Sequence, residues 1–291
     1  MYSGMSMLEY IAPVAASLTW SLNPAIISKY RRHIKPILFT GFRALAAIIF
    51  LFPIAVFTGL TIPDAAGLSL LIIMASAVLG PGVGDASYTK AIQVIGGSLA
   101  VVLSYTYIFV SQFIAAAFLN EPLKPSVLIG SLLAFAGIIV ASVNGGGVRV
   151  SAKGIGYALL ASLSWGVATV MIKVALFYAD VFTLTVMRLG FTAVFFIPAG
   201  LIVEGGPSKT DSKPMAKAAL ITGVLGWSIG MLLFIYSIGM IGVSATAVAT
   251  ALTPVLSQLT VKALSREKPA LKTIIGALLI STGIASSLLL N

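Results

Sequence analysis

The feature that most constrains the fold of this sequence is a series of long, continuously apolar segments. A helix needs about 20 apolar residues to cross the hydrocarbon core of a bilayer. The strict alternation of polarity that marks the strands of a membrane barrel is absent from these segments. We therefore predict an all-α integral membrane protein with ten transmembrane helices. Their predicted spans are residues 8–28, 36–59, 67–89, 95–118, 126–143, 154–175, 181–203, 216–238, 242–264 and 271–290.

The composition favours the same class of protein. Hydrophobic residues make up 59% of the chain and charged residues 9%, and the mean hydropathy is +1.08. Soluble domains carry about 25% charged residues. The only charge near the start of the first span is Glu9, whereas a cleaved signal begins with basic residues, so we expect this helix to be retained. The chain has no cysteine, which excludes a disulfide framework and a thiolate metal site.

The two halves of the chain share a repeated pattern. Each half has an arginine followed ten residues later by a proline, in TGFRALAAIIFLFPIAV and in TVMRLGFTAVFFIPAGL. We therefore predict one five-helix repeat at residues 1–146 and a second at 147–291. The matched stretches are LTWS (18–21) with LSWG (163–166), EPLKPSVLIGSLLAFAGI (121–138) with EKPALKTIIGALLISTGI (267–284), and Arg43 with Arg188.

An odd number of helices in each repeat forces the two repeats into opposite orientations, and the basic residues agree with this inversion. Fourteen of the eighteen Lys and Arg residues fall on one predicted side, two fall on the other, and two lie within spans. Positive residues favour the cytoplasmic face, so we expect a multi-pass protein of the cell membrane with both termini outside. The fourteen are Lys29, Arg31, Arg32, Lys35, Lys90, Arg149, Lys153, Lys209, Lys213, Lys217, Lys262, Arg266, Lys268 and Lys272.

The net charge of +10 follows from this topology. Because no basic patch alternates with exposed aromatic residues, we expect no binding to nucleic acid. Inverted repeats are typical of secondary transporters, in which the solute site lies near the membrane midplane between the repeats. The sequence therefore predicts a central cavity between the two halves.

The pattern resembles the EamA-type transporters of the drug/metabolite transporter superfamily. The resemblance rests on a tryptophan in the first helix of each repeat, an arginine seven residues into the second, glycines in the fifth, and a glutamate after the fourth in FLNEPLKP and LSREKP. It implies export or exchange of small metabolites, often amino acids, through a central cavity, with the fifth and tenth helices outside that cavity. The family commonly has a proline in each fourth helix; Pro254 fits, whereas the first half has Ile108, so we expect that half to be less kinked.

Three charged residues deep in the spans are candidates for gating or coupling, since a charge at mid-helix costs about 2.5–3.5 kcal/mol on insertion scales. Arg43 and Arg188 either snorkel to headgroups, bond to carbonyls of a neighbouring helix, or contact an anion or act as gate charges. Asp85 follows Gly80, Pro81, Gly82 and Gly84, which we expect to interrupt the third helix. It either pairs with Arg43 or Lys90 or serves as a protonatable coupling site.

Polar and aromatic residues are candidates for solute binding. A polar stripe at i, i+7 and i+14 on the fourth helix has a partly matching stripe on the ninth, and tryptophans and tyrosines supply apolar walls. The alternatives are bonds between helices, at about 0.6 kcal/mol each, and aromatic packing or an interfacial belt. Asn23, followed by Pro24, is expected to bend the first helix toward the cavity. The candidates are Ser98, Tyr105, Gln112, Thr250, Gln258, Trp20, Trp165, Trp227, Tyr88, Tyr236 and Asn23.

We therefore predict a secondary transporter that exports or exchanges small metabolites, such as amino acids, by alternating access. No cofactor and no metal is expected; the partners are the solute and the lipid bilayer. Both a monomer and a homo-oligomer are compatible with the sequence. The alternatives are a channel, although no charged ring or filter segment is visible, and a membrane-embedded enzyme acting on a lipid-soluble substrate. An enzyme would need clustered acids or histidines, whereas the single histidine, His33, lies in a loop.

Overall fold

The computed structural model describes residues 7–60, 66–121, 125–142 and 151–289, and these ranges contain helices and no strands. The predicted boundary between the repeats, at residues 146 and 147, lies outside them, as does Arg149. The elements are α1 (Met7–Tyr30), α2 (Pro36–Thr58), α3 (Ala66–Ala77), η1 (Val78–Gly84), α4 (Asp85–Ile95), α5 (Gly97–Ser104), α6 (Tyr107–Leu119), α7 (Pro125–Ser142), α8 (Ala152–Ala175), α9 (Val181–Val203), α10 (Lys209–Thr222), η2 (Gly223–Gly230), α11 (Met231–Ala249), α12 (Leu252–Thr260), η3 (Val261–Ser265) and α13 (Leu271–Leu289).

Seven helical stretches in the described part of the chain are long and apolar enough to cross a membrane. Large apolar side chains cover the outer surface of the bundle, among them Phe57 and Ile202, which are 91% and 83% exposed. Such a surface suits lipid and not water. Three predicted spans have no counterpart among the seven: 126–143 corresponds to α7, 242–264 to the end of α11 with α12 and η3, and 271–290 to α13. The count of ten spans therefore stays a prediction.

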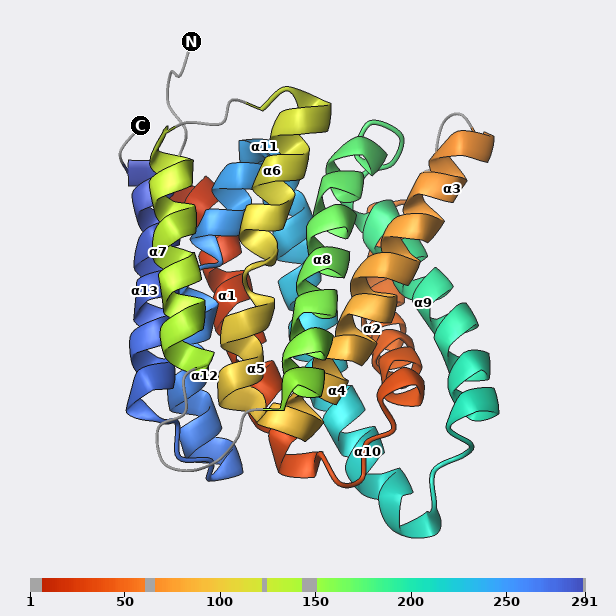
Figure 1. Cartoon of the computed structure of the whole chain (residues 1–291). Helices are drawn as coiled ribbons and strands as arrows, with labels where there is room; N and C mark the ends of the chain where they lie inside the picture. The colour runs from red at the N-terminus through yellow and green to blue at the C-terminus, as the bar shows by residue number, and fades with distance from the viewer. Residues whose placement is uncertain (1–6, 61–65, 122–124, 143–150, 290–291) are drawn as a thin grey trace.

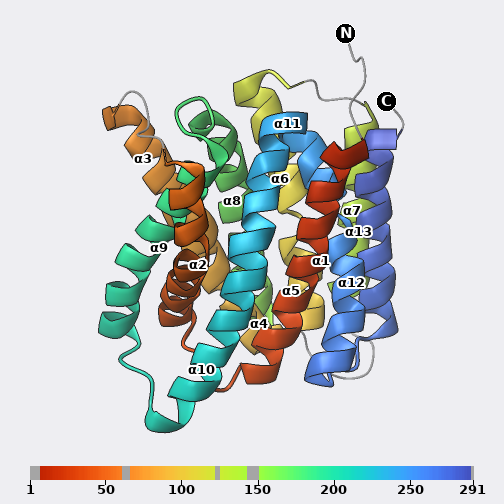
Figure 2. The ribbon, with the colours of Figure 1, turned by 180° about the vertical axis from the view of Figure 1, so that it is seen from behind.

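The helices form one bundle, with α1 beginning and α13 ending at the same end of it (Figure 1). At one edge α7 and α13 lie side by side, and at the opposite edge α2 packs against α9. The view from behind shows α1 and α11 crossing the middle of the bundle (Figure 2). The middle of the bundle is therefore built from helices of both halves of the chain.

Glycines allow the edge helices to approach closely. A Cβ atom at Gly200 in α9 would lie 2.5 Å from the backbone nitrogen of Leu38 in α2, and a Cβ atom at Gly41 would lie 2.7 Å from the nitrogen of Ile197. Between α7 and α13, a Cβ atom at Gly137 would lie 2.7 Å from the carbonyl oxygen of Gly276. Small residues at such contacts let membrane helices gain packing energy that lipid does not supply.

The predicted interruption around Pro81 is a widening of the helix. Residues Val78–Gly84 form the π-helical turns of η1, and helical structure continues from α3 through η1 into α4. Proline has no N–H to donate and its ring clashes with the preceding turn, which disfavours a regular α-helix at this point. The second half has a matching π-helical segment, Gly223–Gly230 in η2, which contains no proline and which the sequence did not predict.

The expectation of a less kinked fourth helix in the first half is wrong. Between α5 and α6, Tyr105 and Thr106 leave the α-helix, just as Thr250 and Ala251 do between α11 and α12. The first half reaches the same break without the proline that Pro254 supplies in the second. The break in the second half lies where the ring of Pro254 clashes with the carbonyl group of residue 250, so the proline accounts for that break but not for the one at Tyr105.

Candidate functional site

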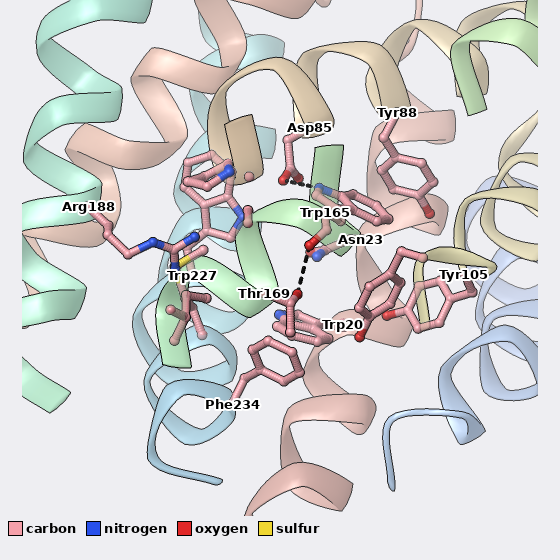
Figure 3. A pocket seen from close by; sticks show the side chains of 16 residues that line it. Trp20, Asn23, Asp85, Tyr88, Tyr105, Trp165, Thr169, Arg188, Trp227 and Phe234 are labelled. Atoms are coloured by element: carbon pink, nitrogen blue, oxygen red, sulfur yellow. Dashed lines mark hydrogen bonds between the residues drawn. The ribbon is translucent and has the colours of Figure 1, made fainter. Parts of the chain in front are cut away.

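A cavity lies in the middle of the bundle, between the two halves of the chain. The empty space between its side chains, including the part that is open to solvent, is about 670 Å³. Half of its sixteen lining residues precede α7 in the chain and half follow it (Figure 3). They are Trp20, Asn23, Gly80, Pro81, Asp85, Tyr88, Tyr105 and Tyr107, and then Trp165, Ala168, Thr169, Ile172, Arg188, Trp227, Met231 and Phe234. No described residue of α7 or α13 is among them.

Aromatic rings form most of the cavity wall. The Trp165 ring makes edge contacts with Tyr88, Tyr107 and Tyr105, at centroid distances of 5.0, 5.9 and 6.3 Å. Trp20 packs against Phe234 at 5.0 Å. Edge-to-face pairs of this kind are favourable beyond the area they bury. The rings therefore hold one another in place around a largely apolar space.

The two wide helical segments make room for the tryptophans. A Cβ atom at Gly84, at the end of η1, would lie 2.5 Å from Trp165 Cδ1. A Cβ atom at Gly230, at the end of η2, would lie 2.7 Å from Trp20 Nε1. Gly84 and Gly230 are 146 residues apart in the chain. The tryptophan of each half thus packs against a glycine of the other half, and the two glycines occupy equivalent positions in the repeat.

Polar groups reach the cavity at a few points. Trp20 Nε1 donates to the carbonyl oxygen of Gly226 at 2.8 Å, and Trp165 Nε1 donates to Asp85 Oδ2 at 3.1 Å. Asn23 is buried, and its Oδ1 atom has no hydrogen-bond partner in the described part of the chain. A buried amide oxygen without a partner is costly. The wall of the cavity therefore contains one acceptor whose hydrogen-bonding capacity is unused.

Arg43 and Asp85 form a buried ion pair. Arg43 Nη1 donates to Asp85 Oδ1 at 2.8 Å, and the guanidinium lies over the Trp227 ring at 4.2 Å from its centroid. Of the two predicted partners of Asp85, Arg43 is the one that binds it. The side chain of Arg43 is fully buried, so snorkelling to headgroups is wrong for this residue.

Arg188 is also buried, at 2% exposure, and does not snorkel. Its Nε donates to Ser76 Oγ at 3.0 Å and its Nη2 to the Ser76 carbonyl oxygen at 3.2 Å, which matches the predicted bond to a carbonyl of a neighbouring helix. Its Nη1 lies 3.5 Å from Met231 Sδ, a weak acceptor. Arg188 lines the cavity, whereas Arg43 lies behind two lining residues, Asp85 and Trp227.

The structure brings together eight of the fourteen predicted site residues in the cavity wall and leaves six outside it, which are Arg43, Ser98, Gln112, Tyr236, Thr250 and Gln258. Ser98 donates a hydrogen bond to Gln258 Oε1. Both residues thus form a bond between helices, which was the predicted alternative to solute binding. Thr250 lies 3.1 Å from the Tyr107 hydroxyl, and Tyr236 is 42% exposed on the outer surface. The break at Tyr105 turns the stripe, so that Tyr105 lines the cavity but Ser98 and Gln112 do not.

Several further lining residues were not predicted from the sequence, among them Tyr107, Thr169, Met231 and Phe234. The repeat carried a signal for two of them. Phe234 lies 146 residues after Tyr88, and Met231 lies 146 residues after Asp85. Alignment of the halves therefore identifies both as counterparts of predicted residues.

The chain matches known transporters over nearly all of its length. The model of the EamA-like transporter family matches it twice, at residues 7–143 and 152–289. An uncharacterized transporter of Archaeoglobus fulgidus is 28% identical over 164 residues, which are 56% of this chain and 57% of that protein, so the match spans little more than half of the relative. The uncharacterized transporter YvbV of Bacillus subtilis is 25% identical over 277 residues, 92% of this chain and 87% of that protein.

A solved crystal structure shares the fold. It aligns with 97% of this chain and 97% of its own chain, with a TM-score of 0.72 and 18% sequence identity. The repeated family match covers both helical halves around the cavity, and the helical bundle has an apolar outer surface. This multi-span membrane protein therefore belongs to the EamA-like transporter family.

Proposed function

We propose that this transporter carries a small organic solute by alternating access and that the central cavity is its solute site. The observation that carries the proposal is the composition of the cavity wall, to which the two halves contribute equally. A site at the interface of two repeats changes its exposure when one repeat rocks against the other. The aromatic wall suits an apolar or aromatic group, and Asn23, Asp85 and Arg188 suit a polar one, as in an amino acid or a similar solute.

We further propose ten transmembrane spans arranged as two inverted repeats. The excess of basic residues on one predicted side supports this arrangement. So does the bundle itself, in which the connections after α6 and after α12 lie at opposite ends although they hold the matching residues Glu121 and Glu267 (Figure 1). Both termini are then extracytoplasmic in the cell membrane. A reporter fused to Asn291 that is active only in the cytoplasm would contradict this orientation.

Solute exchange in liposomes tests the transport proposal. Purified protein is reconstituted, and counterflow of labelled aromatic and aliphatic amino acids is measured. We expect exchange by the natural protein and a loss of about tenfold or more in Trp165→Ala, since this ring contacts three others in the wall. Lys217→Gln, which changes an exposed residue of α10, is the control and should exchange normally. A passive ion conductance without exchange would instead indicate a channel.

A further inference from the structure

Each half of the chain has a buried arginine at the equivalent position of the repeat, but the two arginines have different neighbours. Arg43 and Arg188 are 145 residues apart, and Asp85 and Met231 are 146 apart. Arg43 Nη1 meets Asp85 Oδ1 at 2.8 Å, and Arg188 Nη1 meets Met231 Sδ at 3.5 Å. The second half therefore repeats the geometry of the first with a thioether where the first has a carboxylate.

Arg188 consequently has no counter-charge of its own. Within the described residues, no carboxylate oxygen lies within the 4.0 Å of an ion pair from its nitrogens. The nearest candidate, Asp85, is already bonded to Arg43 and to Trp165. Ser76 accepts two of the hydrogen bonds of Arg188, but a neutral serine does not balance a buried charge. A buried, unpaired cation is costly unless something supplies the missing anion.

The unpaired guanidinium borders the cavity. Figure 3 shows the Arg188 side chain pointing from α9 toward the space beside Trp227. Gly80 keeps this approach open, since a Cβ atom there would lie 2.9 Å from Arg188 Nη2. A guanidinium has five N–H donors, and Ser76 and Met231 take three. At least two donors are left for a ligand.

We propose that Arg188 binds a carboxylate of the transported solute, which supplies the counter-charge that Asp85 supplies to Arg43. The inference rests on the proposed function and adds to it the chemical class of the solute: an organic acid or zwitterion whose apolar part lies against the aromatic wall. An organic carboxylate fits better than an inorganic anion because the remaining wall is mostly aromatic. The planar fork of arginine also matches the two oxygens of a carboxylate.

Binding is measured by tryptophan fluorescence, because all three tryptophans of the chain line the cavity. The probes are two acids with their neutral amides, phenylacetate with phenylacetamide and 4-methylpentanoate with 4-methylpentanamide, and the zwitterion phenylalanine with phenylalaninamide, which keeps the ammonium group. We expect at least one acid to bind about 10- to 100-fold more tightly than its amide, the size of a charge-assisted hydrogen bond. If no acid exceeds its amide, or if chloride and acetate compete as well as the best acid, the proposal is wrong.

Variants assign that preference to Arg188. Arg188→Gln should remove the preference for acids, and Arg188→Lys should weaken acid binding but keep the preference. Lys217→Gln removes an exposed cation and should change neither. An unchanged acid preference in folded Arg188→Gln would overturn the proposal.

Met231 provides a test that keeps the arginine. Met231→Asp gives Arg188 an internal counter-charge, whereas Met231→Asn adds a neutral group of the same size. We expect acid binding at least about tenfold weaker in Met231→Asp than in Met231→Asn, because the internal carboxylate competes for the guanidinium. Equal affinities of the two Met231 variants would contradict the proposal. If Arg188→Gln does not fold, the comparison of these two variants is the test of the proposal.

The same variants in the exchange assay separate the two proposals. If acid binding depends on Arg188 but no solute is exchanged, the carboxylate site is supported and the transport proposal is wrong. Exchange in which acids and amides move equally well, and in which Met231→Asp behaves like Met231→Asn, would keep the transporter and remove the carboxylate site.

Discussion

Glu121 and Glu267 make equivalent contacts in opposite halves of the chain. Glu267 Oε1 accepts hydrogen bonds from Ser28 Oγ and from the backbone N–H of Gly97, at 2.5 and 3.3 Å. Glu121 accepts from Ser244 Oγ at 2.5 Å and from the backbone N–H of Val243 at 3.4 Å. Glu121 follows α6 and contacts the turn of α11 that begins after Gly242, and Glu267 follows η3 and contacts the start of α5, so each glutamate joins the two halves.

The backbone N–H groups that the two glutamates bind come directly after glycines with positive φ. Gly96 has φ 80° and precedes the backbone bound by Glu267; Gly242 has φ 85° and precedes the backbone bound by Glu121. A helix that starts after such a turn has N–H groups without partners inside the helix, and a carboxylate satisfies them.

Removing either carboxylate should destabilise the fold. We expect Glu121→Gln and Glu267→Gln each to lower the free energy of unfolding by about 1–3 kcal/mol, since each loses charge-assisted hydrogen bonds to helix N–H groups. Unfolding in a denaturing detergent, followed by tryptophan fluorescence, measures this. Asp211→Asn, which alters a partly exposed ion pair with His33, is the control and should shift the midpoint less than either glutamate variant. Equal midpoints for all three variants would count against the contacts.

The ion pair between Arg43 and Asp85 should show strong coupling. Either Arg43→Gln or Asp85→Asn leaves one charge buried without a partner, which costs about 3–5 kcal/mol. The double variant removes both charges, so its loss should be clearly smaller than the sum of the two single losses. A double-variant cycle of unfolding free energies measures the difference. Additive losses would mean that the two side chains do not stabilise each other.

Proton coupling through Asp85 is a separate prediction. If the carboxyl group takes up a proton in the transport cycle, Asp85→Asn should abolish accumulation driven by a pH gradient and spare counterflow exchange. Because Asp85 also holds Arg43, a purely structural role should reduce both activities together. Parallel assays in liposomes with and without a pH gradient separate the two. Normal pH-driven accumulation by the folded variant would exclude the coupling role.

Two glycines of α9 should respond oppositely to alanine. A Cβ atom at Gly200 would lie 2.5 Å from the backbone of Leu38, so Gly200→Ala should cost about 1–3 kcal/mol through overpacking. At Gly190 no atom lies within 4 Å of an added Cβ, so Gly190→Ala should gain about 0.5–1 kcal/mol from helix propensity. The unfolding assay above compares them. Similar effects of the two would argue against the close approach of α2 and α9.

The sequence predicted the helices and much of the cavity because both depend on local pattern. Apolar length placed the helices, and the repeat placed Trp20 and Trp165, which meet glycines of the opposite half. The orientation of side chains around a helix was harder to predict. The break at Tyr105 rotates the faces before and after it, which explains why the stripe through Ser98 and Gln112 misses the cavity.

The error at Tyr236 has a similar origin. Two residues apart on a helix, Phe234 and Tyr236 point in different directions, and only the packing of α11 against α1 decides that Phe234 faces the cavity. The gating role of Arg43 and Arg188 stays a prediction. Their contacts are fixed here by buried neighbours, and a gate requires those contacts to change during transport.

The central claim is that the cavity opens alternately to the two sides of the membrane, and one cysteine tests it most directly. The chain has no cysteine, so Thr169→Cys places a single thiol in the cavity wall. Its labelling by a membrane-impermeant reagent is measured in vesicles of each orientation, with and without Glu121→Gln or Glu267→Gln. Because the two glutamates join the halves at opposite ends of the bundle, weakening one contact should favour opening at that end (Figure 1). We predict that Glu267→Gln speeds labelling from the cytoplasmic side and slows it from outside, and that Glu121→Gln does the reverse; labelling rates that rise together on both sides, or that stay unchanged in both variants, would contradict the account.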